Sequence, residues 1–567
     1  PQSIPLHFTF TVHFIQLVQL PAMLSSVALL AVAAAGPALG AIVNYEFAIS
    51  NVNAAPDGFE RSVVAVNGQI PGTLIKANKG DTLRINVTNQ LTDSSMRRST
   101  TIHWHGLFQS GTAAEDGPAF VTQCPISQFN SYTYDIPLHD QTGTFWYHSH
   151  LSSQYVDGLR GPLVIYDPND PQKDLYDVDD ETTIITLDDW YHTPAPTLQE
   201  QFFSTSNTAL NAPVPDSALI NGKGRYVGGP EVERAVLKVQ SGKRYRFRVI
   251  NTSAIGSYTF AIEGHTMTII EADGIAHEPL VVDSFDIYAG QRYSFVLEAN
   301  QTVANYWVSA PMTVAAAGSN SLLDPTNVYA VLRYEGAPEA EPTTELSTAM
   351  GNAPLVEENL HALINPGAPG GSDPADVVVN LAIGRSTIDG PADVVVNLAI
   401  GRSTIDGSVA FTFNGVQYKP PTLPTLLQIL ANNATSDADF GTDEHTLTLP
   451  FNKTIELVIT GGANHPIHLH GHTFDVVQSL GGSINYVNPP RRDVVRVSNT
   501  GVILRFRTDN PGPWFVHCHI DWHLEAGLAV VFAEAPSEIR SGSQSVATSS
   551  SWDQLCPKYQ ALSADLQ

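Results

Sequence analysis

The sequence predicts an all-β protein made of consecutive Greek-key β-sandwich domains. Short runs of alternating apolar and polar residues recur between turn residues, as in "TLRINVTNQ", "RYSFVLEAN" and "GVILRFRTDN". Long amphipathic helical patterns are scarce. The 42 glycines and 38 prolines favour the many turns that such sandwiches need.

The length predicts several domains. A chain of 567 residues is long enough for about three or four domains of ~100–200 residues each. Two linkers rich in proline and acidic residues, "YDPNDPQKD" and "EGAPEAEPTTE", separate the candidate domains. We therefore expect domains at 41–170, 171–340 and 341–567.

The N-terminal region predicts export. Residues 23–40, "MLSSVALLAVAAAGPALG", form a short apolar run that ends in small residues, as in a secretory signal peptide. Residues 1–22 then precede the signal as an upstream extension of the gene model. A membrane anchor is the alternative, but the run is short for a span and is interrupted by Gly36 and Pro37. We expect a secreted, extracellular protein.

The net charge disfavours some classes of binding partner, and the cysteines and glycosylation signals fit an extracellular protein. The chain has 29 Lys and Arg against 56 Asp and Glu, a net charge of −27 that disfavours nucleic acid and anionic membranes. In an oxidising compartment, Cys124 and Cys556 are expected to form a disulfide, which leaves Cys518 free. Glycosylation signals are candidates for an extracellular glycoprotein at Asn86, Asn251, Asn300, Asn433 and Asn452.

Ten of the 19 histidines fall in four clusters. The clusters are "HWHG" (His103, His105), "YHSH" (His148, His150), "HPIHLHG" (His465, His468, His470) and "HCHIDWH" (His517, His519, His523). One such pair is weak evidence for a metal site. Four clusters, two toward each end of the chain, predict metal binding.

The spacing around Cys518 predicts two kinds of metal site. On a strand, His517 and His519 point to one face and Cys518 to the other. A thiolate with two imidazoles and a weak axial position is the ligand set of a blue-copper centre, and His523 and His465 could complete it. The remaining eight histidines could hold a trinuclear copper cluster. Zinc is the alternative metal, but structural zinc sites are rich in cysteine. The candidate ligands here are one cysteine and ten histidines, which does not fit that pattern.

These four motifs, in this order and spacing, resemble those of the multicopper oxidases, and within them the fungal laccases of the basidiomycete type. The resemblance extends from about Ala41 and includes "VNGQIPG", "EDGPAFVTQCPI", "GTFWYHSHLSSQYVDGLRGPLVIYD", "RDVVRV" and "RFRTDNPGPWFVHCHIDWHLEAGLAVVFAEAP". It implies three consecutive cupredoxin-like domains and four copper ions. The mononuclear copper would lie in the third domain and the trinuclear cluster between the first and third.

The resemblance also implies a role for each ligand. The type-1 copper takes His465, Cys518 and His523, and the type-2 copper takes His103 and His468. The type-3 pair takes His105, His148, His150, His470, His517 and His519. The axial position falls on Leu528, which cannot ligate and should therefore raise the potential relative to methionine. His472 matches no ligand position, and we interpret it as structural.

The implied activity is one-electron oxidation of small phenols and aromatic amines, coupled to four-electron reduction of dioxygen to water by a monomer. Electrons would enter at His523 and pass from Cys518 through its two neighbouring histidines. Asp116 and Asp521 match acidic positions that supply protons, although either is also explained as an ordinary loop or capping carboxylate. The alternatives are a ferroxidase or ascorbate oxidase, or a copper and electron carrier without oxidase activity.

The sequence differs from many members of the family at two places. One is the position of a second disulfide, and the other is a residue that contacts the phenolic substrate in relatives. Val156 and Ala254 stand where many relatives have a second disulfide. Ile255 stands where many relatives have an acid that receives the phenolic hydrogen. The mode of phenol binding is therefore open.

An identical tandem repeat lies in the third domain. "PADVVVNLAIGRSTIDG" occupies Pro374–Gly390 and again Pro391–Gly407. A sheet can rarely accept a spare hydrophobic strand without a change of register. We expect one copy to be displaced from the sheet of the third domain, or only loosely packed.

Overall fold

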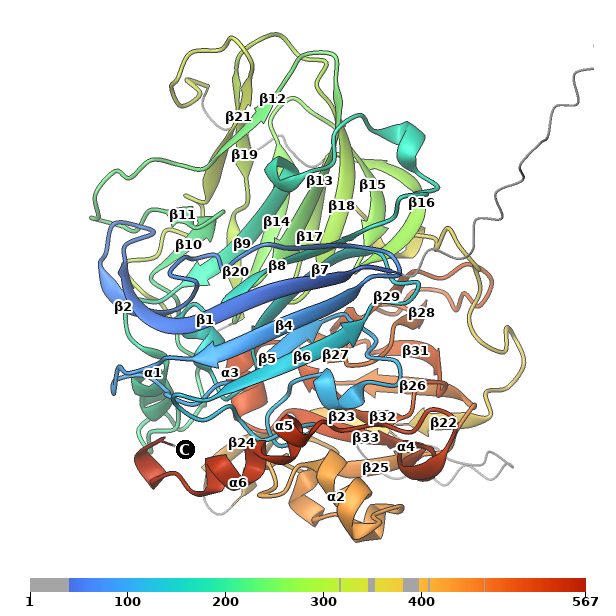
Figure 1. Cartoon of the computed structure of the whole chain (residues 1–567). Coiled ribbons are helices and arrows are strands. Elements are labelled where there is room, and N and C mark those ends of the chain that lie inside the picture. The colour runs from blue at the N-terminus through green and yellow to red at the C-terminus, as the bar shows by residue number, and fades with distance from the viewer. Residues whose placement is uncertain are drawn as a thin grey trace, which may run out of the picture. The chain divides into compact units, whose positions relative to one another are not determined.

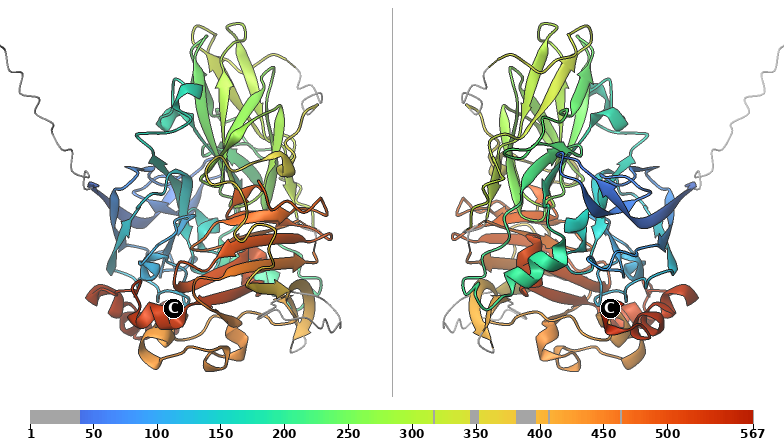
Figure 2. Two further views of the ribbon diagram at one scale, coloured as in Figure 1. Left: turned by 90° about the vertical axis from the view of Figure 1, so that its right-hand side faces the viewer. Right: turned by 90° about the vertical axis from the view of Figure 1, so that its left-hand side faces the viewer.

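The computed structural model describes residues 40–315, 318–344, 352–380, 397–405, 408–462 and 464–566. The predicted upstream extension and all of the predicted signal peptide except Gly40 lie outside these residues. The described strands form six sheets in three successive pairs, which follow one another along the blue-to-red colour gradient of Figures 1 and 2. Among the described helices, none is long and apolar enough to cross a membrane.

The first pair of sheets lies within predicted domain 1. One sheet has the order β2-β1-β4-β6: β1 Ile42–Ala54, β2 Arg61–Val66, β4 Thr82–Asn89 and β6 Ser131–Pro137. The other has the order β3-β8-β7-β5: β3 Ile75–Asn78, β5 Ile102–His105, β7 Gly143–Ser149 and β8 Arg160–Tyr166.

The second pair lies within predicted domain 2. The sheet β11-β10-β9-β13-β18-β15-β16 contains β9 Ile184–Trp190, β10 Ser217–Ile220, β11 Lys223–Gly224, β13 Arg244–Asn251, β15 Met267–Ala272, β16 Ile275–Val282 and β18 Arg292–Glu298. The sheet β12-β21-β19-β14-β17, with β20 beside β14, contains β12 Val236–Val239, β14 Gly256–Ile262, β17 Ser284–Ile287, β19 Asn305–Ser309, β20 Met312–Val314 and β21 Tyr329–Tyr334.

The third pair lies within predicted domain 3. The sheet β24-β23-β26-β31-β28-β29, with β22 beside β26, contains β22 Val377–Asn380, β23 Asn397–Ile405, β24 Ser408–Phe413, β26 Thr454–Thr460, β28 Phe474–Gln478, β29 Arg491–Arg492 and β31 Val502–Arg507. The sheet β25-β33-β32-β27-β30 contains β25 Thr446–Leu449, β27 His465–Leu469, β30 Val494–Val497, β32 Gly512–Cys518 and β33 Ala529–Glu534.

The same design repeats in all three pairs, which confirms the predicted all-β fold of cupredoxin-like domains. Each of the six sheets combines antiparallel neighbours with one strand that has a parallel partner: β4 with β1, β8 with β3, β13 with β9, β21 with β12, β26 with β22 and β23, and β33 with β25. Strand β4 shows why these segments form strands. Its alternate residues Leu83, Ile85 and Val87 are fully buried, whereas Arg84 between them is exposed.

The helices are short. The α-helices are α1 Ala195–Phe202, α2 Thr425–Asn432, α3 Asp521–Glu525, α4 Pro536–Ser541, α5 Ser550–Asp553 and α6 Leu555–Gln560. The 3-10 helices are η1 Ala113–Glu115, η2 Gln154–Asp157, η3 Lys173–Leu175, η4 Glu181–Thr183, η5 Glu357–Asn359, η6 Asp437–Asp439, η7 Thr442–Glu444 and η8 Ala564–Leu566. Cys556 on α6 is disulfide-bonded to Cys124 of domain 1, as predicted, and Cys518 is the free cysteine.

The structure corrects one predicted glycosylation site. Asn251 is fully buried, and its amide nitrogen donates to the main-chain oxygens of Gly256 and Ile287. A glycan on this nitrogen is incompatible with the fold. Asn300, Asn433 and Asn452 are exposed and Asn86 is partly exposed, so these four stay candidates.

The two copies of the repeat share one strand position in the described residues. Strand β22 belongs to the first copy and β23 to the second, and both run parallel to β26. Asn380 and Asn397, which are equivalent in the two copies, both pair with Val458. Residues 381–396 and 406–407 lie outside the described residues, so the displacement of one copy stays a prediction.

Candidate metal centres

Two antiparallel strand pairs carry most of the clustered histidines. In domain 1, β5 pairs with β7 so that His103 lies opposite His148. In domain 3, β27 pairs with β32 so that His468 lies opposite His517. The local cause is strand alternation, which places residues i and i+2 of each "HxH" motif on the same face.

The first centre is formed by His465, Cys518 and His523. The Cys518 Sγ atom lies 3.4 Å from His465 Nδ1 and 3.7 Å from His523 Nδ1, and the two nitrogens are 3.2 Å apart. All three side chains are buried. One sulfur and two imidazole nitrogens therefore converge, as the sequence predicts for a blue-copper ligand set.

Leu528 is connected to two residues of this centre by main-chain hydrogen bonds. Its N–H donates to the main-chain oxygen of His523 at 3.0 Å, and its carbonyl accepts from the Cys518 N–H at 3.1 Å. Its side chain is fully buried. These contacts place the Leu528 backbone beside the backbones of Cys518 and His523, and its axial role stays a prediction.

The second centre gathers the other eight predicted histidines at the junction of domains 1 and 3. Their ring nitrogens form three buried groups, each with members from both domains. The groups are His103, His105 and His468; His105, His148 and His519; and His150, His470 and His517. Residues 517 and 519 thus face this cluster while Cys518 faces the other centre, which is the arrangement predicted from strand alternation.

The protonation state of the cluster suits metal binding. Burial, and repulsion among the rings, lower the pKa of His105, His148, His150, His468, His470 and His519 well below the ordinary value. Burial lowers the pKa of His517 to about 3. Neutral imidazoles keep a lone pair, which is the form that binds metal ions.

Unpartnered nitrogens point to the same conclusion. Buried ring nitrogens without a hydrogen-bond partner are His103 Nε2, His105 Nε2, His148 Nε2, His150 Nε2, His468 Nε2 and His519 Nδ1. Several of the opposite nitrogens are held by main-chain oxygens: His103 by Asp116, His148 by Ser149, and His468 by Asp493. Buried polar atoms normally have partners, so a set of orphaned nitrogens in one place fits a metal cluster.

The two predicted acids occupy different positions. Asp116 is fully buried within the cluster, and its Oδ2 accepts from His470 Nδ1 at 2.9 Å. Asp521 begins α3, its N–H donates to the Ala254 carbonyl at 2.9 Å, and its Oδ2 is buried without a hydrogen-bond partner. Burial raises the pKa of both carboxyls. Asp116 therefore contacts a predicted ligand, His470, directly. Asp521 lies in the sequence between His519, which belongs to the second centre, and His523, which belongs to the first.

The structure adds one residue that the sequence did not single out, and it explains another. The main-chain oxygen of Asp493 accepts from His468, and its Oδ1 lies 3.5 Å from His105 Nε2. The only signal was its place in the motif "RDVVRV". His472, interpreted as structural, pairs with Glu534 at 2.7 Å and belongs to none of the metal-binding groups in the described part of the chain.

One centre has a thiol and two imidazoles, and the other has eight converging imidazoles. The segment at the end of β32 contributes to both centres. This combination defines a class of copper protein. In this class, a mononuclear site that accepts one electron at a time lies next to a cluster that collects several electrons. The same fold, in three repeats, carries both centres on its first and third domains.

Comparison with known proteins agrees with this class. Models of the multicopper oxidase family match residues 48–170, 181–337 and 418–538. The chain is 70% identical to Laccase-4 of Thanatephorus cucumeris over 90% of this chain and 93% of that protein. It is 49% identical to Laccase-2 of Agaricus bisporus over 92% and 96%. The chain belongs to the multicopper oxidase family.

Solved structures give the same result. The structure of Fet3p, a multicopper oxidase that functions in iron import, superposes with a TM-score of 0.78 and 28% identity over 93% of this chain and 98% of that chain. The laccase from Botrytis aclada superposes with a TM-score of 0.76 and 30% identity over 92% of each chain.

Proposed function

We propose that this chain is a secreted, monomeric laccase-type oxidase. It would couple one-electron oxidation of small phenols and aromatic amines to four-electron reduction of dioxygen to water. The observation that carries the proposal is the connection between the centres. His517, Cys518 and His519 are consecutive, yet each belongs to a different metal-binding group.

The ligand groups support four copper ions. One is held by His465, Cys518 and His523, one by His103 and His468, and a pair by His105, His148, His150, His470, His517 and His519. Copper bound in these positions would supply the redox chemistry, with single-electron transfer near Cys518 and four-electron reduction of dioxygen at the cluster. The protein contributes the short covalent path from the Cys518 sulfur through the peptide bonds to its two neighbours.

We expect electrons to enter through His523. Its side chain is buried beneath the ring of Phe411, whose centroid lies 4.2 Å from that of His523. Ile255, at the position where many relatives carry an acid, is itself buried and offers no carboxylate. We therefore propose that the phenolic proton leaves to solvent rather than to a side chain at position 255.

Two carboxyls are proposed to handle the protons that water formation consumes. Asp116 contacts the ligands His103 and His470 directly, and its raised pKa lets it hold a proton beside the cluster. Asp521 lies on α3, two residues from both His519 and His523.

A ferroxidase is the second candidate, because Fet3p shares the fold over nearly its whole length. The sequence favours a laccase, since the identity is 70% to Laccase-4 of Thanatephorus cucumeris and 28% to Fet3p. A copper carrier without oxidase activity would not need the eight-histidine cluster.

The test is to express the chain with copper and measure bound copper, visible absorption and oxygen uptake. A laccase should bind about four copper ions per chain, show a blue band, and consume oxygen faster with phenols and aromatic amines than with iron(II) or ascorbate. The variant Cys518→Ser should lose the blue band and the oxygen uptake together. Faster uptake with iron(II) would favour the ferroxidase, and a blue protein without oxygen uptake would favour the carrier.

A further inference from the structure

Domain 2 supplies none of the predicted ligands, yet its backbone reaches the histidine cluster. Gly290 has a φ of +84°, and a Cβ atom there would lie 2.8 Å from His519 Cδ2 and 3.1 Å from His105 Cε1. Both the conformation and the close approach require glycine. The loop before β18 therefore packs directly on ligands that belong to the other two domains.

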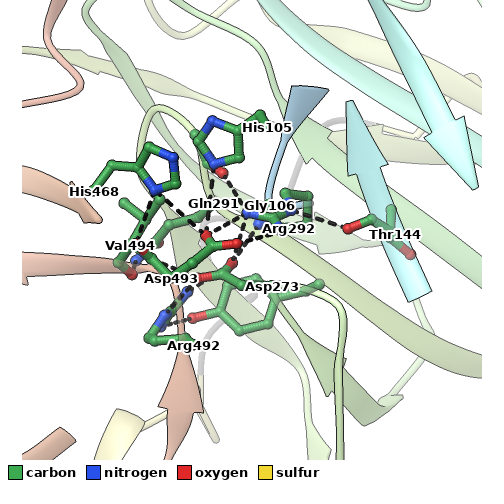
Figure 3. Close-up of polar contacts among 12 residues, drawn as sticks. His105, Gly106, Thr144, Asp273, Gln291, Arg292, His468, Arg492, Asp493 and Val494 are labelled. Atoms are coloured by element: carbon green, nitrogen blue, oxygen red, sulfur yellow. Dashed lines mark hydrogen bonds and ion pairs between the residues drawn. The ribbon is translucent and has the colours of Figure 1, made fainter. Parts of the chain in front are cut away.

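Two residues after Gly290, the fully buried Arg292 joins all three domains. Its Nη1 and Nη2 donate to the two carboxylate oxygens of Asp493 at 2.6 and 2.7 Å. Its Nε donates to the Thr144 carbonyl of domain 1 at 3.0 Å, and its Nη1 also donates to the Gly290 carbonyl at 3.1 Å. Figure 3 shows this guanidinium between Asp493 and Thr144.

Asp493 then links the arginine to the ligands. Its main-chain oxygen accepts from His468 Nδ1 at 2.9 Å, and its Oδ1 lies 3.5 Å from His105 Nε2 (Figure 3). Ligand orientation depends on such outer partners, whose loss typically costs ~10–100-fold in metal affinity or activity. Asp493 therefore contacts two members of the group His103, His105 and His468: His468 through its main-chain oxygen and His105 through its carboxylate.

Asp273 of domain 2 fixes the same segment from the other side. It accepts from the Arg292 N–H at 2.8 Å, from Arg492 Nε at 2.9 Å and from the Val494 N–H at 3.1 Å. The residues on both sides of Asp493 are thus bound to domain 2. A buried ion pair is by itself weak evidence for a contribution to stability. The role of Arg292 is therefore inferred from the contacts between Asp493 and the predicted ligands, and not from the ion pair itself.

We propose that Arg292 is a positioning residue for the copper cluster. Its planar guanidinium holds Asp493 by the carboxylate, so that the Asp493 main-chain oxygen is positioned to orient His468 and the carboxylate lies beside His105. Domain 2 would in this way control the geometry of the type-2 copper site. The inference rests on the proposed function, because it assumes copper at His103 and His468.

The test is Arg292→Lys, which keeps the positive charge and loses the planar fork that reaches both carboxylate oxygens and Thr144 together. Bound copper should fall from about four to about three ions per chain. The type-2 signal in electron paramagnetic resonance should be lost or changed in its hyperfine splitting, while the blue band is retained. Oxygen uptake should fall at least tenfold.

The matched control is Arg505→Lys. Arg505 is also buried and pairs with Glu456 at 2.8 Å, and its Nη1 donates to the carbonyls of residues 369, 371 and 373 rather than to any predicted ligand. This variant should keep the wild-type copper content and the wild-type type-2 signal, even if it melts at a lower temperature.

Full copper content with an unchanged type-2 signal in Arg292→Lys would overturn the proposal. If that variant does not fold, Asp493→Asn weakens the same contact without changing side-chain size, and the same unchanged result there would overturn it. A wild-type protein that binds no copper at the cluster would instead overturn the proposed function, so the two failures are distinguishable.

Discussion

Glu115, next in sequence to Asp116, shows how burial near the cluster couples protonation to stability. It is 8% exposed and accepts a hydrogen bond from the Tyr132 hydroxyl at 2.8 Å. Burial raises its pKa from 4.5 to about 8. The folded protein therefore keeps this proton up to about pH 8, whereas the unfolded chain releases it near pH 4.5. Unfolding releases a proton between these values, so stability from this group is complete below pH 4.5 and declines as the pH rises toward 8.

We predict that Glu115→Gln flattens this pH dependence. Glutamine keeps an oxygen for Tyr132 and has no proton to lose, so the decline between pH 5 and 8, on the order of 5 kcal/mol for a shift of this size, should shrink. The measurement is the melting temperature of the copper-loaded protein at several pH values. Glu233→Gln, at a side chain that is 94% exposed, is the control and should follow the wild type. Parallel curves for Glu115→Gln and wild type would contradict the prediction.

At the scale of elements, most strands were predictable because alternation is a local signal. "TLRINVTNQ" corresponds to β4, "RYSFVLEAN" to β18 and "GVILRFRTDN" to β31. The convergence of the clustered histidines was predictable for the same reason, since each cluster is a short motif on or beside a strand. Arg292 and Asp273 were not, because a buried ion pair between distant segments leaves no periodic pattern around either residue.

The tandem repeat allows a prediction about β22 and β23. Asn380 and Asn397 pair with the same residue of β26, so both copies follow one register. Deleting residues 374–390 would bring the second copy's identical "VVVN" into the place of β22 without any change of register. The deletion should cost no stability, because one continuous segment would then make the pairings that β22 and β23 make with β26.

The expected result is a melting temperature within about 2 °C of wild type and an unchanged blue band. A matched destabilising control is Ile455→Ala, at a fully buried residue of β26, which should cost ~2–5 kcal/mol. A clear loss of melting temperature in the deletion variant would show that both copies contribute to the sheet.

At the scale of the whole molecule, the contacts between domains 1 and 3 include the histidine cluster and the disulfide. Cys124 of domain 1 is bonded to Cys556 on α6, across 432 residues of sequence. The rings of Phe120 and Tyr559 pack nearby at 5.7 Å, and Ser99 donates to the Leu566 carbonyl at 2.7 Å. The sequence could predict this pairing only from the cysteine count, and could not predict that the C-terminal helices pack on domain 1.

We predict that the double variant Cys124→Ser, Cys556→Ser weakens the cluster before the mononuclear site. The chain-entropy model assigns a loop of this length on the order of 6 kcal/mol, which engineered removals often do not reach. Because the ligands of the cluster come from both domains, loosening domain 1 from domain 3 separates them. The three ligands near Cys518 all belong to domain 3 and stay together. On heating, the double variant should therefore lose oxygen uptake and cluster copper at a temperature where the blue band persists. Simultaneous loss of both signals, at the wild-type temperature, would contradict the prediction, because the disulfide would then add nothing to the other contacts between domains 1 and 3.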